Sequence, residues 1–442
     1  MKAWHRRLAR AAYSALLRAV VPLYLLRVAW RGRAEPLYRS APGQRLGLYR
    51  GAAVPGAVWI HAVSLGETLA AEPLVRALRQ ARSDVRLVLS HGTATGRAAG
   101  QALLRAGDAQ AWLPFDTPGG GRRFLDHFAP SVGVLMETEI WPNVLAEAQA
   151  RGIPVVLANA RMSERSRRRG GRVDALLRPA FETLAAVFAQ GPDDAERLRA
   201  AGAREVDVLG NLKYDIAPDQ ALQARGRFWR ASVGRPVVLA AITREGEEAL
   251  LFDAWCRLPA GRPLLVVVPR HPQRFDAVAG LIRDAGLSLA RRSAWNDGPP
   301  HDAWTVDAWL GDSMLEMPLY YGLADVALLG GSFAPLGGQN LIEAAACGCP
   351  LVMGPHTFNF SDAAAQAVAA GAAIRVADMA AGIAAALDLA APEAAGRRAE
   401  RSSRALAFAG AHRGAAARTA ARIVALLDGP AATRAARGPK PS

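Results

Sequence analysis

The chain has 442 residues, 51% of them hydrophobic, and a formal net charge of +15 at pH 7. This length exceeds one ordinary hydrophobic core and favours two domains. Its three cysteines exclude a disulfide framework and fit a reducing cytoplasm. Cys347 and Cys349 have no second pair nearby, so small buried side chains explain them better than a zinc site does.

The positive charge indicates either an Arg-rich solvated surface or an anionic partner, namely nucleic acid, a membrane surface or a phosphorylated substrate. The positions of the charges decide between these readings. Eight Lys or Arg residues lie between Lys2 and Arg33, and the first acidic residue is Glu35. A second basic cluster extends from Arg161 to Arg172.

Apolar residues recur at helical spacing from Trp4 to Trp30. Arg18 and Arg27 interrupt this stretch, whereas a spanning helix needs roughly 20 apolar residues. No small-residue cleavage site follows, which argues against a signal peptide. We therefore expect residues 1–34 to form an amphipathic helix on an anionic membrane surface. A first helix packed into the protein core is the alternative, because it has the same periodicity.

From residue 58 onward, short apolar runs alternate with Ala/Leu-rich stretches, and this alternation predicts an α/β fold with parallel sheets covered on both faces. The expected buried strands are Val58–Ala62, Val85–Leu89, Val132–Met136, Val155–Ala158, Val237–Ala241, Leu264–Val268, Ala324–Leu329 and Leu351–Met353. The expected helices include Leu69–Gln80, Asn143–Arg151 and Ala175–Phe188.

A polar stretch with Pro and Gly, residues 215–235, interrupts the alternation. We therefore expect two doubly wound Rossmann-like domains, an N-terminal one over residues 35–220 and a C-terminal one over residues 221–428. An Ala/Gly/Arg-rich disordered tail is expected over residues 429–442. Ligands of such sheets bind beyond the carboxyl ends of the strands, here in a cleft between the domains.

The first strand runs into Ser64-Leu65-Gly66-Glu67. A carboxylate in a loop at the carboxyl end of a strand is well placed to act as a general base. The alternative is a capping box, in which Ser64 caps a helix and Glu67 reaches back to it. Pro73 would lie inside a helix that begins at Leu65, so we expect the helix to begin later or to be kinked.

Two further polar segments close strands of the first half. Glu137 and Glu139 follow a buried strand directly, and a helix N-terminus explains one acidic residue better than two. Lys213 lies where the chain leaves the first half. It either enters the cleft or forms a surface pair with Asp215, and the spacing alone does not decide.

In the second half, Pro269 and Arg270 end a strand, where a basic group can meet a phosphate. Gly337 and Gly338 precede a helix near Glu343. Glycines let the backbone approach an anion, the helix N-terminus offers N–H groups, and Glu343 can bind ribose hydroxyls. Such a loop is often only a tight turn. The histidines are too scattered for metal-ligand spacing, so no metal site is expected.

Together these segments resemble the Kdo transferases of lipopolysaccharide synthesis, the 3-deoxy-D-manno-octulosonate transferases. The matching segments follow the family order along nearly the whole chain. They are residues 59–67, 137–143, 159–163, 210–215, 268–274, 337–343 and 354–360. Residues 137–143 and 354–360 carry the motifs that are specific to this family, whereas the single glycine loops do not.

The resemblance implies a GT-B fold and an inverting glycosyl transfer that uses neither a bound metal nor another cofactor. It implies CMP-Kdo as donor and a lipid A precursor, lipid IVA, as acceptor, in lipopolysaccharide inner-core synthesis. The implied partner surface is the cytoplasmic face of the inner membrane and not nucleic acid. Glu67 is implied as the general base, and Glu137 and Lys213 as transition-state support.

The resemblance also implies where the nucleotide binds. The residues placed against CMP are Pro269, Arg270, Met314, Leu315, Glu316, Asn340, Leu341, Ile342 and Glu343. Three departures from the family pattern fall in this half. Ile242-Thr243-Arg244 stands for the usual Ser-Thr-His, Leu315 for a glycine, and Leu341 for a proline.

Two other functions fit parts of the pattern. A GT-B transferase with a UDP-sugar donor and a different lipid acceptor would share the phosphate and ribose cradle. A non-catalytic peripheral membrane protein would keep the fold without the chemistry. The joint presence of Glu67, Glu137, Lys213, Arg270 and Glu343 argues against the second.

Overall fold

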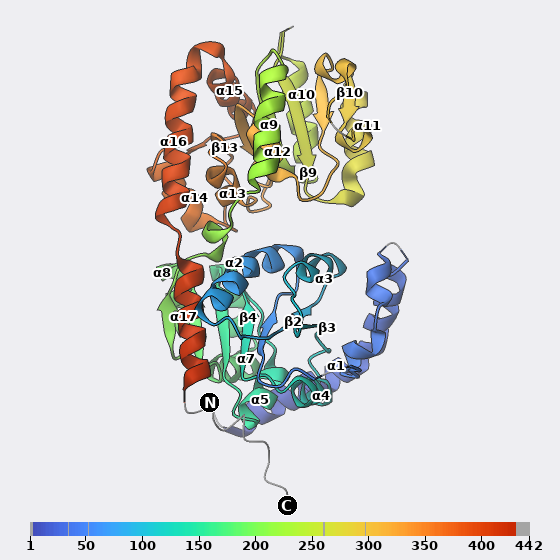
Figure 1. Ribbon diagram of the computed structural model, residues 1–442, viewed down its shortest axis with the longest axis vertical. Helices are drawn as coiled ribbons and strands as arrows, with labels where there is room; N and C mark the ends of the chain where they lie inside the picture. Colours follow the sequence, from blue (N-terminus) through green and yellow to red (C-terminus); the bar gives the residue numbers. More distant parts are fainter. Residues whose placement is uncertain (1–2, 34, 52, 260, 297, 430–442) are drawn as a thin grey trace, which may run out of the picture. The chain divides into compact units, whose positions relative to one another are not determined.

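The computed structural model of the chain describes residues 3–33, 35–51, 53–259, 261–296 and 298–429. It divides into two compact units, Met1–Ile216 with Arg413–Ser442, and Ala217–His412. Each unit is built on a parallel sheet of seven strands with helices on both sides (Figure 1). The two doubly wound halves expected from the sequence are confirmed.

The first unit's sheet has the order β3-β2-β1-β4-β5-β6-β7. Its strands are β1 (Val58–His61), β2 (Leu87–His91), β3 (Ala109–Trp112), β4 (Val132–Met136), β5 (Val155–Ala160), β6 (Ala186–Ala189) and β7 (Val206–Val208). The chain runs outward from β1 to β3 and then returns to β4 on the other side of β1. The strand order therefore reverses between β1 and β4, and ligands of such sheets bind beyond the carboxyl ends of the strands at this switch point.

Two hydrophobic cores cover the two faces of this sheet. Successive β1 residues alternate between them, because Val58 belongs to one core and Trp59 to the other. The helical elements are α1 (Ala3–Arg31), η1 (Pro36–Arg39), η2 (Pro42–Leu46), α2 (Leu65–Ala81), α3 (Ala94–Gln101), α4 (Pro118–Phe128), α5 (Pro142–Ala150), α6 (Glu164–Gly171), α7 (Asp174–Glu182), α8 (Pro192–Ala200), η3 (Leu212–Asp215) and α17 (Ala415–Asp428).

The last helix, α17, packs on the first unit, where Figure 1 shows it in red beside α2. Ala420 and Ile423 are buried in the same core as Leu74 of α2. Asp215 fixes the start of α17, because its carboxylate accepts hydrogen bonds from the backbone N–H groups of Gly414 and Ala416 at 2.6 and 2.7 Å. The second unit therefore ends at His412, not at the expected residue 428. Of the expected tail, residues 430–442 lie outside the described residues.

The second unit's sheet has the order β10-β11-β9-β8-β12-β13-β14, with its switch point between β8 and β12. The strands are β8 (Val237–Thr243), β9 (Leu264–Pro269), β10 (Leu289–Arg291), β11 (Ala308–Leu310), β12 (Val326–Leu329), β13 (Leu351–Met353) and β14 (Ala373–Arg375). The helical elements are α9 (Gln220–Ser232), α10 (Glu247–Cys256), η4 (Pro272–Arg274), α11 (Phe275–Asp284), η5 (Arg292–Ala294), η6 (His301–Trp304), α12 (Met317–Leu323), α13 (Leu341–Ala346), α14 (Ser361–Ala369), α15 (Met379–Ala390), η7 (Pro392–Ala394) and α16 (Ala395–Ala411).

The expected strands are present, and their ends agree with the expected ones to within two residues. The expected helix over 175–188 is wrong, because α7 ends at Glu182 and residues 186–189 form the buried strand β6. That strand reads Ala-Val-Phe-Ala and is buried on both faces, so it lacks the alternation that distinguishes a strand from a helix.

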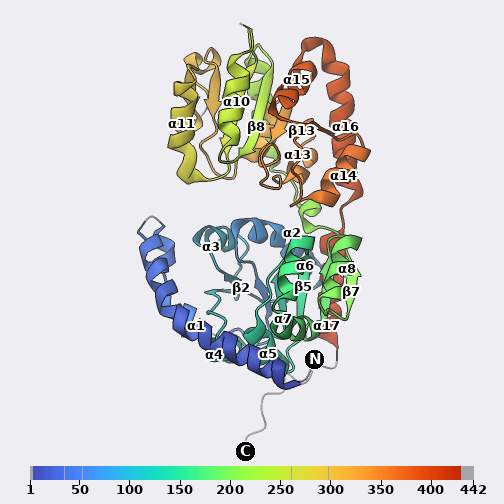
Figure 2. The same cartoon turned by 180° about the vertical axis from the view of Figure 1, so that it is seen from behind.

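Helix α1 is 29 residues long and contains Pro22. It is long and apolar enough, by length and composition, to cross a membrane. One side docks on the first unit, where Ser14 Oγ donates to Asn143 Oδ1 at 3.1 Å and Arg6 pairs with Glu182 at 2.7 Å. Figure 2 shows α1 following the edge of this unit along α5 and α4. Its other side exposes large apolar residues, which are Trp4, Leu8, Leu16, Val20, Leu23, Tyr24, Leu26 and Trp30. The helix is therefore neither detached from the protein nor buried in its core.

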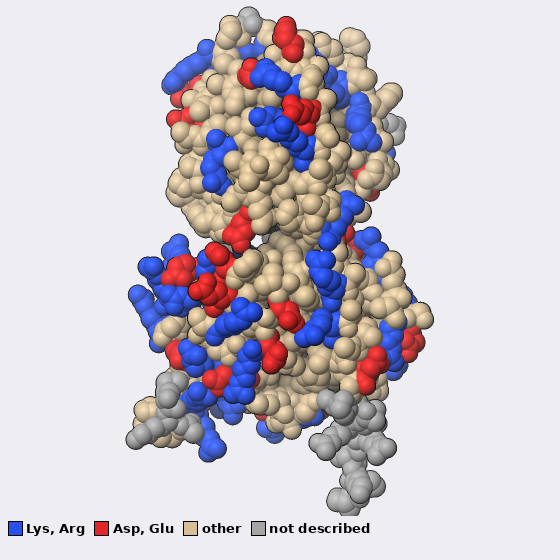
Figure 3. Space-filling view, turned by 90° about the vertical axis from the view of Figure 1, so that its left-hand side faces the viewer, with Lys and Arg blue, Asp and Glu red and all other residues tan. Residues whose placement is uncertain are grey.

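The net charge is distributed over the surface. On the face seen in Figure 3, Lys and Arg side chains lie on both units and are interleaved with Asp and Glu. The total of +15 therefore does not come from a single patch on this face, and local clusters carry the argument about partners.

Candidate active site

Glu67 lies in the first turn of α2, just beyond the carboxyl end of β1. The helix begins at Leu65, so the expectation of a later start is wrong. Ser64 caps it, because Ser64 Oγ accepts the Glu67 N–H at 3.4 Å. The Glu67 carboxylate in turn accepts hydrogen bonds from the Val63 N–H at 2.8 Å and from Ser64 Oγ at 2.9 Å. These bonds and the buried face of α2 outweigh the cost of the interior Pro73, about 3 kcal/mol.

The capping geometry does not prevent Glu67 from acting as a base. Burial and, next, the nearby Glu139 raise the pKa of Glu67 to about 7, and Glu137 adds to the effect. The hydrogen bonds from Val63 and Ser64 oppose it. A general base is most effective when its pKa lies near the working pH, and this carboxylate meets that condition.

Glu137 directly follows β4 and is almost fully buried. Lys213 Nζ donates to its Oε1 at 2.7 Å, and Arg161 Nε donates to its Oε2 at 3.1 Å. Burial alone would raise the pKa of Glu137, but the two cations outweigh this and hold it below its usual value. Glu137 is therefore a fixed negative charge. The alternative pairing of Lys213 with Asp215 is wrong, because Asp215 binds the start of α17 instead.

Strained backbone marks the same place. Glu137 and Asn159 have φ values of 56° and 53°, which are uncommon for residues other than glycine and cluster at functional sites. Asn159, in β5, accepts the Leu212 N–H through Oδ1 at 2.9 Å and so fixes the segment that carries Lys213. The sequence assigned no role to Asn159, and it marked Arg161 only as the start of the basic cluster 161–172. Both residues lie at the end of a predicted buried strand, and this position was the sequence feature that could have indicated a functional role.

Glu139 is held by its own small network. Trp141 Nε1 donates to its carboxylate at 2.9 Å. The ring of His61 contacts that of Trp141 edge-on, with centroids 5.6 Å apart. Burial lowers the pKa of His61 to about 3, so this histidine is neutral and acts by packing. The network fixes Glu139, one of the charges that raise the pKa of Glu67.

A cavity of about 360 Å³ opens beside Glu137. Its lining combines basic side chains with apolar ones, among them Arg161, Met162, Arg167 and Phe181. It lies between the end of β4 and helices α6 and α7, within the first unit. The lining carries the arginines Arg161, Arg167 and Arg178 against the carboxylates of Glu137 and Asp174, so an amphiphilic anionic ligand suits its polarity and its small excess of positive charge.

In the second unit, Arg270 follows β9 and Glu343 lies on α13. Arg270 is exposed and Glu343 is partly buried. Among the described residues, neither side chain has a hydrogen-bond partner. Burial raises the pKa of Glu343 to about 7 and the charge of Arg270 opposes this, so the two side chains are close enough to interact. Both groups are available for a ligand.

The other residues expected to contact the nucleotide differ in the groups that are available to bind it. Asn340 caps α13 by accepting the Ile342 N–H at 3.2 Å, so its side-chain oxygen is already engaged. Pro269, Leu341 and Ile342 are buried, so their side chains are not exposed to a ligand. Because Leu341 is the first residue of α13, whose N–H needs no partner within the helix, it replaces the family proline without strain.

The loop 314–316 shows the larger departure. Met314 and Leu315 are exposed, whereas Glu316 pairs with Arg292 at 2.8 Å. Leu315 has a φ of 64°, a conformation that glycine adopts readily and leucine does not. The glycine that the family has there fits this backbone better, and the leucine places a large side chain next to the expected nucleotide.

Buried carboxylates hold the loops of the second unit in place. Glu247 accepts the N–H groups of Gly331 and Phe333 at 2.6 and 3.0 Å, which ties the loop after β12 to α10. Gly330 is required by space, since a Cβ atom there would lie 2.2 Å from the carbonyl oxygen of Ile242. Ile242 itself has a φ of 58°. The end of β8 is therefore as constrained as the end of β4.

The two closely spaced cysteines, Cys347 and Cys349, are both buried, as the small-residue interpretation predicted. Within the described ranges, no cluster of three or more His, Cys, Asp or Glu side chains is arranged to hold a metal ion.

Two Rossmann-like units with polar side chains at the carboxyl ends of both sheets define the GT-B fold, which glycosyltransferases share with other sugar-nucleotide enzymes. A glycosyltransferase from Rickettsia africae ESF-5 superposes with a TM-score of 0.57 at 10% identity, over 84% of this chain and 99% of that chain. UDP-GlcNAc 2-epimerase from Neisseria meningitidis, bound to UDP-GlcNAc, superposes with 0.53 at 15% identity over the same shares. These likenesses concern the fold alone.

The sequence comparisons identify the family. Residues 41–216 match the family described as 3-deoxy-D-manno-octulosonic-acid transferase (kdotransferase). The 3-deoxy-D-manno-octulosonic acid transferase of Bordetella pertussis is 48% identical over 385 residues, which cover 84% of this chain and 88% of that protein. The Haemophilus influenzae enzyme of the same name is 35% identical over 363 residues, covering 80% and 84%. The chain belongs to the Kdo transferase family, and it is a glycosyltransferase.

Proposed function

We propose that the chain transfers Kdo from CMP-Kdo to a lipid A precursor, lipid IVA, with inversion at the anomeric carbon, in lipopolysaccharide inner-core synthesis. Within the family just established, the observation that carries this proposal is the arrangement of charged side chains beyond the carboxyl ends of β1 and β4. A carboxylate with a pKa of about 7, Glu67, lies there beside the fixed ionic cluster of Glu137, Lys213 and Arg161.

Glu67 acts as the base in a single displacement. An acceptor hydroxyl oxygen bonds to the anomeric carbon of Kdo while the bond from that carbon to the CMP phosphate oxygen breaks. The hydroxyl proton passes to the Glu67 carboxylate, and CMP leaves with the electron pair. Glu137 and Lys213 form a preorganised ionic pair that supports the charge developing in the transition state.

The donor binds the second unit. Arg270 meets the phosphate of CMP and Glu343 accepts hydrogen bonds from ribose hydroxyls. The backbone around Asn340, Leu341 and Ile342 surrounds the nucleotide, with Pro269 at the end of β9 and the 314–316 loop completing the site. Support comes from the unpartnered state of the Arg270 and Glu343 side chains among the described residues. The transfer itself uses no metal or other cofactor.

The acceptor binds the first unit, and the cavity beside Glu137 supports a phosphorylated, acylated substrate. Its apolar lining suits part of an acyl chain. The adjoining helix α6 presents basic side chains to its surroundings, and those of Arg165, Arg169 and Arg172 are exposed without a partner in the described part of the chain. These arginines match the phosphates of a lipid A precursor.

Membrane attachment belongs to the same proposal. The exposed apolar side of α1, together with its arginines, supports attachment to the cytoplasmic face of the inner membrane, where the acceptor lipid lies. Replacing Leu23 and Leu26, 66% and 68% exposed, by Glu should release the full-length protein from anionic vesicles in a flotation assay. Undiminished flotation would mean that another surface attaches the protein.

The direct test is incubation of the full-length enzyme with CMP-Kdo and lipid IVA, with the lipid products weighed by mass spectrometry. We expect a product heavier by one or more Kdo residues, and at least about 10²-fold less of it in the same time with Glu67→Gln. CMP should inhibit the reaction at concentrations where UDP does not. Inhibition by UDP and not by CMP would replace the proposed donor with a UDP-sugar.

A further inference from the structure

A second cavity in the first unit has no residue in common with the one beside Glu137. It has a volume of about 510 Å³ and lies between the C-terminal half of α1 and the short helices η1 and η2. Its apolar lining includes Leu25, Leu26 and Trp30 of α1. Three arginines, Arg33, Arg39 and Arg45, line it as well. No role in glycosyl transfer accounts for this arrangement.

Arg45 is the unusual member of this lining, because only 4% of its surface is exposed. Its guanidinium carbon lies 4.1 Å from the ring centre of Trp112 and 5.7 Å from that of Tyr38. Nε and Nη2 are buried without a hydrogen-bond partner among the described residues. A buried charge without an ionic partner is costly, and aromatic faces compensate only part of that cost.

Neighbouring charges do not neutralise Arg45. Arg97 places a second guanidinium over Trp112, 4.9 Å from the ring centre. Glu35, the nearest acidic residue along the chain, pairs with Arg31 at 3.4 Å. None of the cavity-lining residues is acidic. The cavity therefore has an excess of positive charge that an anion would compensate.

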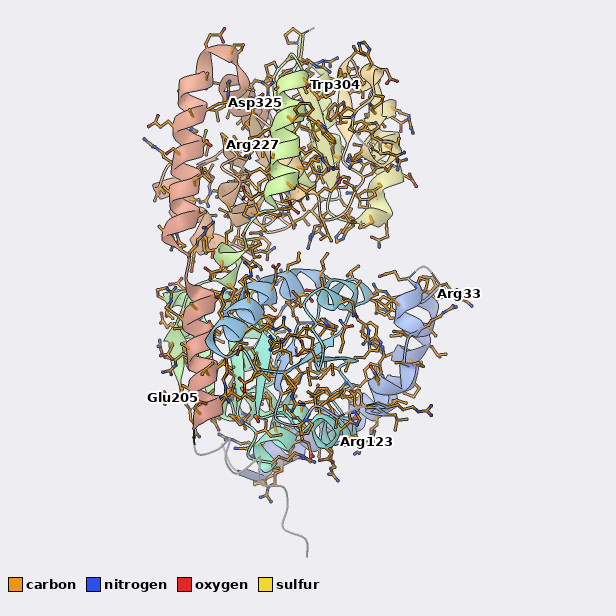
Figure 4. All side chains as sticks on the ribbon, in the orientation of Figure 1. Arg33, Arg123, Glu205, Arg227, Trp304 and Asp325 are labelled. Carbon is orange, nitrogen blue, oxygen red and sulfur yellow. The ribbon has the colours of Figure 1, made fainter. Side chains whose placement is uncertain are left out.

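The remaining lining indicates what kind of anion. Leu26 and Trp30 are 68% and 67% exposed and belong to the apolar side of α1. Arg33 lies at the C-terminal end of the same helix (Figure 4). A small inorganic anion would leave these apolar walls wet, whereas an amphiphile would cover them. The cations and the apolar walls thus select a molecule with one anionic and one hydrocarbon end.

We propose that this cavity binds one anionic phospholipid of the membrane, with its phosphate against Arg45, Arg33 and Arg39 and its acyl chains along Leu25, Leu26 and Trp30. The bound lipid is not the acceptor substrate, and the residues that hold it are separate from those of the proposed active site. Binding fixes the C-terminal half of α1 against η1 and η2 through a lipid headgroup, in addition to the general attraction of α1 to a membrane.

Native mass spectrometry of the full-length protein, released from micelles that contain equal amounts of phosphatidylglycerol and phosphatidylcholine, tests this proposal. We expect one retained phosphatidylglycerol per chain and about tenfold less phosphatidylcholine. The paired substitution of Arg33 and Arg39 by Gln should reduce phosphatidylglycerol retention at least about tenfold, because each substitution removes a charge-assisted hydrogen bond to the phosphate. The matched control pair, Arg18→Gln with Arg27→Gln, removes the same charge from α1 outside the lining and should retain the lipid.

Arg45→Met gives a second, independent readout. It removes the buried charge but keeps an unbranched side chain, so the lipid-free variant should melt no lower than the wild type while losing lipid retention. Added phosphatidylglycerol should raise the melting temperature of the wild type and not that of Arg45→Met.

Three outcomes would overturn the proposal. Equal loss of lipid in both arginine pairs would mean that α1 attracts lipids only by its overall charge. Equal retention of phosphatidylcholine would remove the role of the anion. Displacement of the lipid by glycerol 3-phosphate at similar concentration would show an anion site without a lipid requirement.

Discussion

The polar ends of the two sheets are built differently. In the first unit, Glu137 is almost fully buried and bound by Lys213 and Arg161, so its charges are already paired. In the second unit, the side chains of Arg270 and Glu343 have no hydrogen bonds to other described residues. Burial raises the pKa of Glu343 to about 7. The charged side chains at the end of the first sheet are paired with one another, whereas those at the end of the second sheet are not hydrogen-bonded to other described residues.

This difference matches two functions, transition-state stabilisation and substrate binding. Groups that stabilise a transition state act best when their positions are fixed before the reaction, because reorganisation then costs nothing. Groups that bind a charged substrate need free hydrogen-bonding capacity, which an internal partner would occupy. We infer that the first unit's cluster carries the chemistry and the second unit's open groups carry donor binding. The following predictions separate the two.

Glu67→Gln should have the largest effect. The substitution keeps the shape and removes the proton acceptor, and general-base catalysis contributes about 10²–10⁴-fold. We expect the turnover rate to fall by that factor, measured by product mass over time, with CMP affinity unchanged. Glu72→Gln, which removes an exposed carboxylate from the same helix, is the control. Activity within a few-fold of wild type would return Glu67 to a capping role.

Lys213→Ala should follow. It leaves Glu137 with Arg161 as its only described cation, and loss of one electrostatic contact in a preorganised site costs about 10²-fold in turnover. Because the Lys213–Glu137 pair is largely buried, unfolding free energy should also fall, by about 3 kcal/mol in denaturant titrations. Arg76→Ala breaks the exposed pair with Glu72 and should change stability by less than about 1 kcal/mol. Equal effects of the two variants would remove the distinction.

Arg270→Ala and Glu343→Ala should each weaken CMP binding by about one to two decades, measured by calorimetry, because each removes a charge-assisted hydrogen bond. Glu67→Gln should leave that affinity unchanged. Arg257→Ala, which replaces an exposed arginine directly after α10, is the control. If neither Arg270→Ala nor Glu343→Ala alters CMP affinity, the nucleotide binds elsewhere.

The pH dependence should show the smallest but most specific effect. Glu67 acts as carboxylate, and its pKa is raised to about 7. The turnover rate at saturating donor should therefore rise about tenfold per pH unit below 7 and level off above it. Glu343 also titrates near 7, so saturating donor is needed to separate its effect on binding. A turnover rate that is flat from pH 5 to 8 would contradict a role for Glu67 in proton transfer.

The buried strands were the most predictable part of the fold. Val58–His61, Val132–Met136 and Leu264–Pro269 are continuous apolar runs, as expected of strands covered on both faces. Short strands at or near the sheet edges, such as β7 and β10, escaped notice because three half-exposed residues carry no periodicity. The return of α17 to the first unit could not be predicted either. A polar stretch separates the two units where the chain first leaves the first unit, but no comparable stretch was recognised where the chain returns to it.

The residues proposed for the site come from the sequence, whereas the contacts between them come from the structure. Glu67, Glu137 and Lys213 each follow a strand or close a domain, which flagged them individually. The bond between Lys213 and Glu137 joins residues far apart in the chain, so spacing gave no hint of it and left Asp215 as an equal candidate. Asn159 and Arg161 were quoted within a motif without a role. Their role becomes visible only when β5 lies next to β4 in the sheet.

The most direct test of the division between chemistry and donor binding is the transfer rate measured against CMP-Kdo concentration in Glu343→Ala and in Glu67→Gln. We predict that a high donor concentration restores most of the wild-type rate to Glu343→Ala, because only binding is impaired, and restores none to Glu67→Gln. Restoration of Glu67→Gln by donor, or a concentration-independent loss in Glu343→Ala, would contradict the assignment of chemistry to the first unit and donor binding to the second.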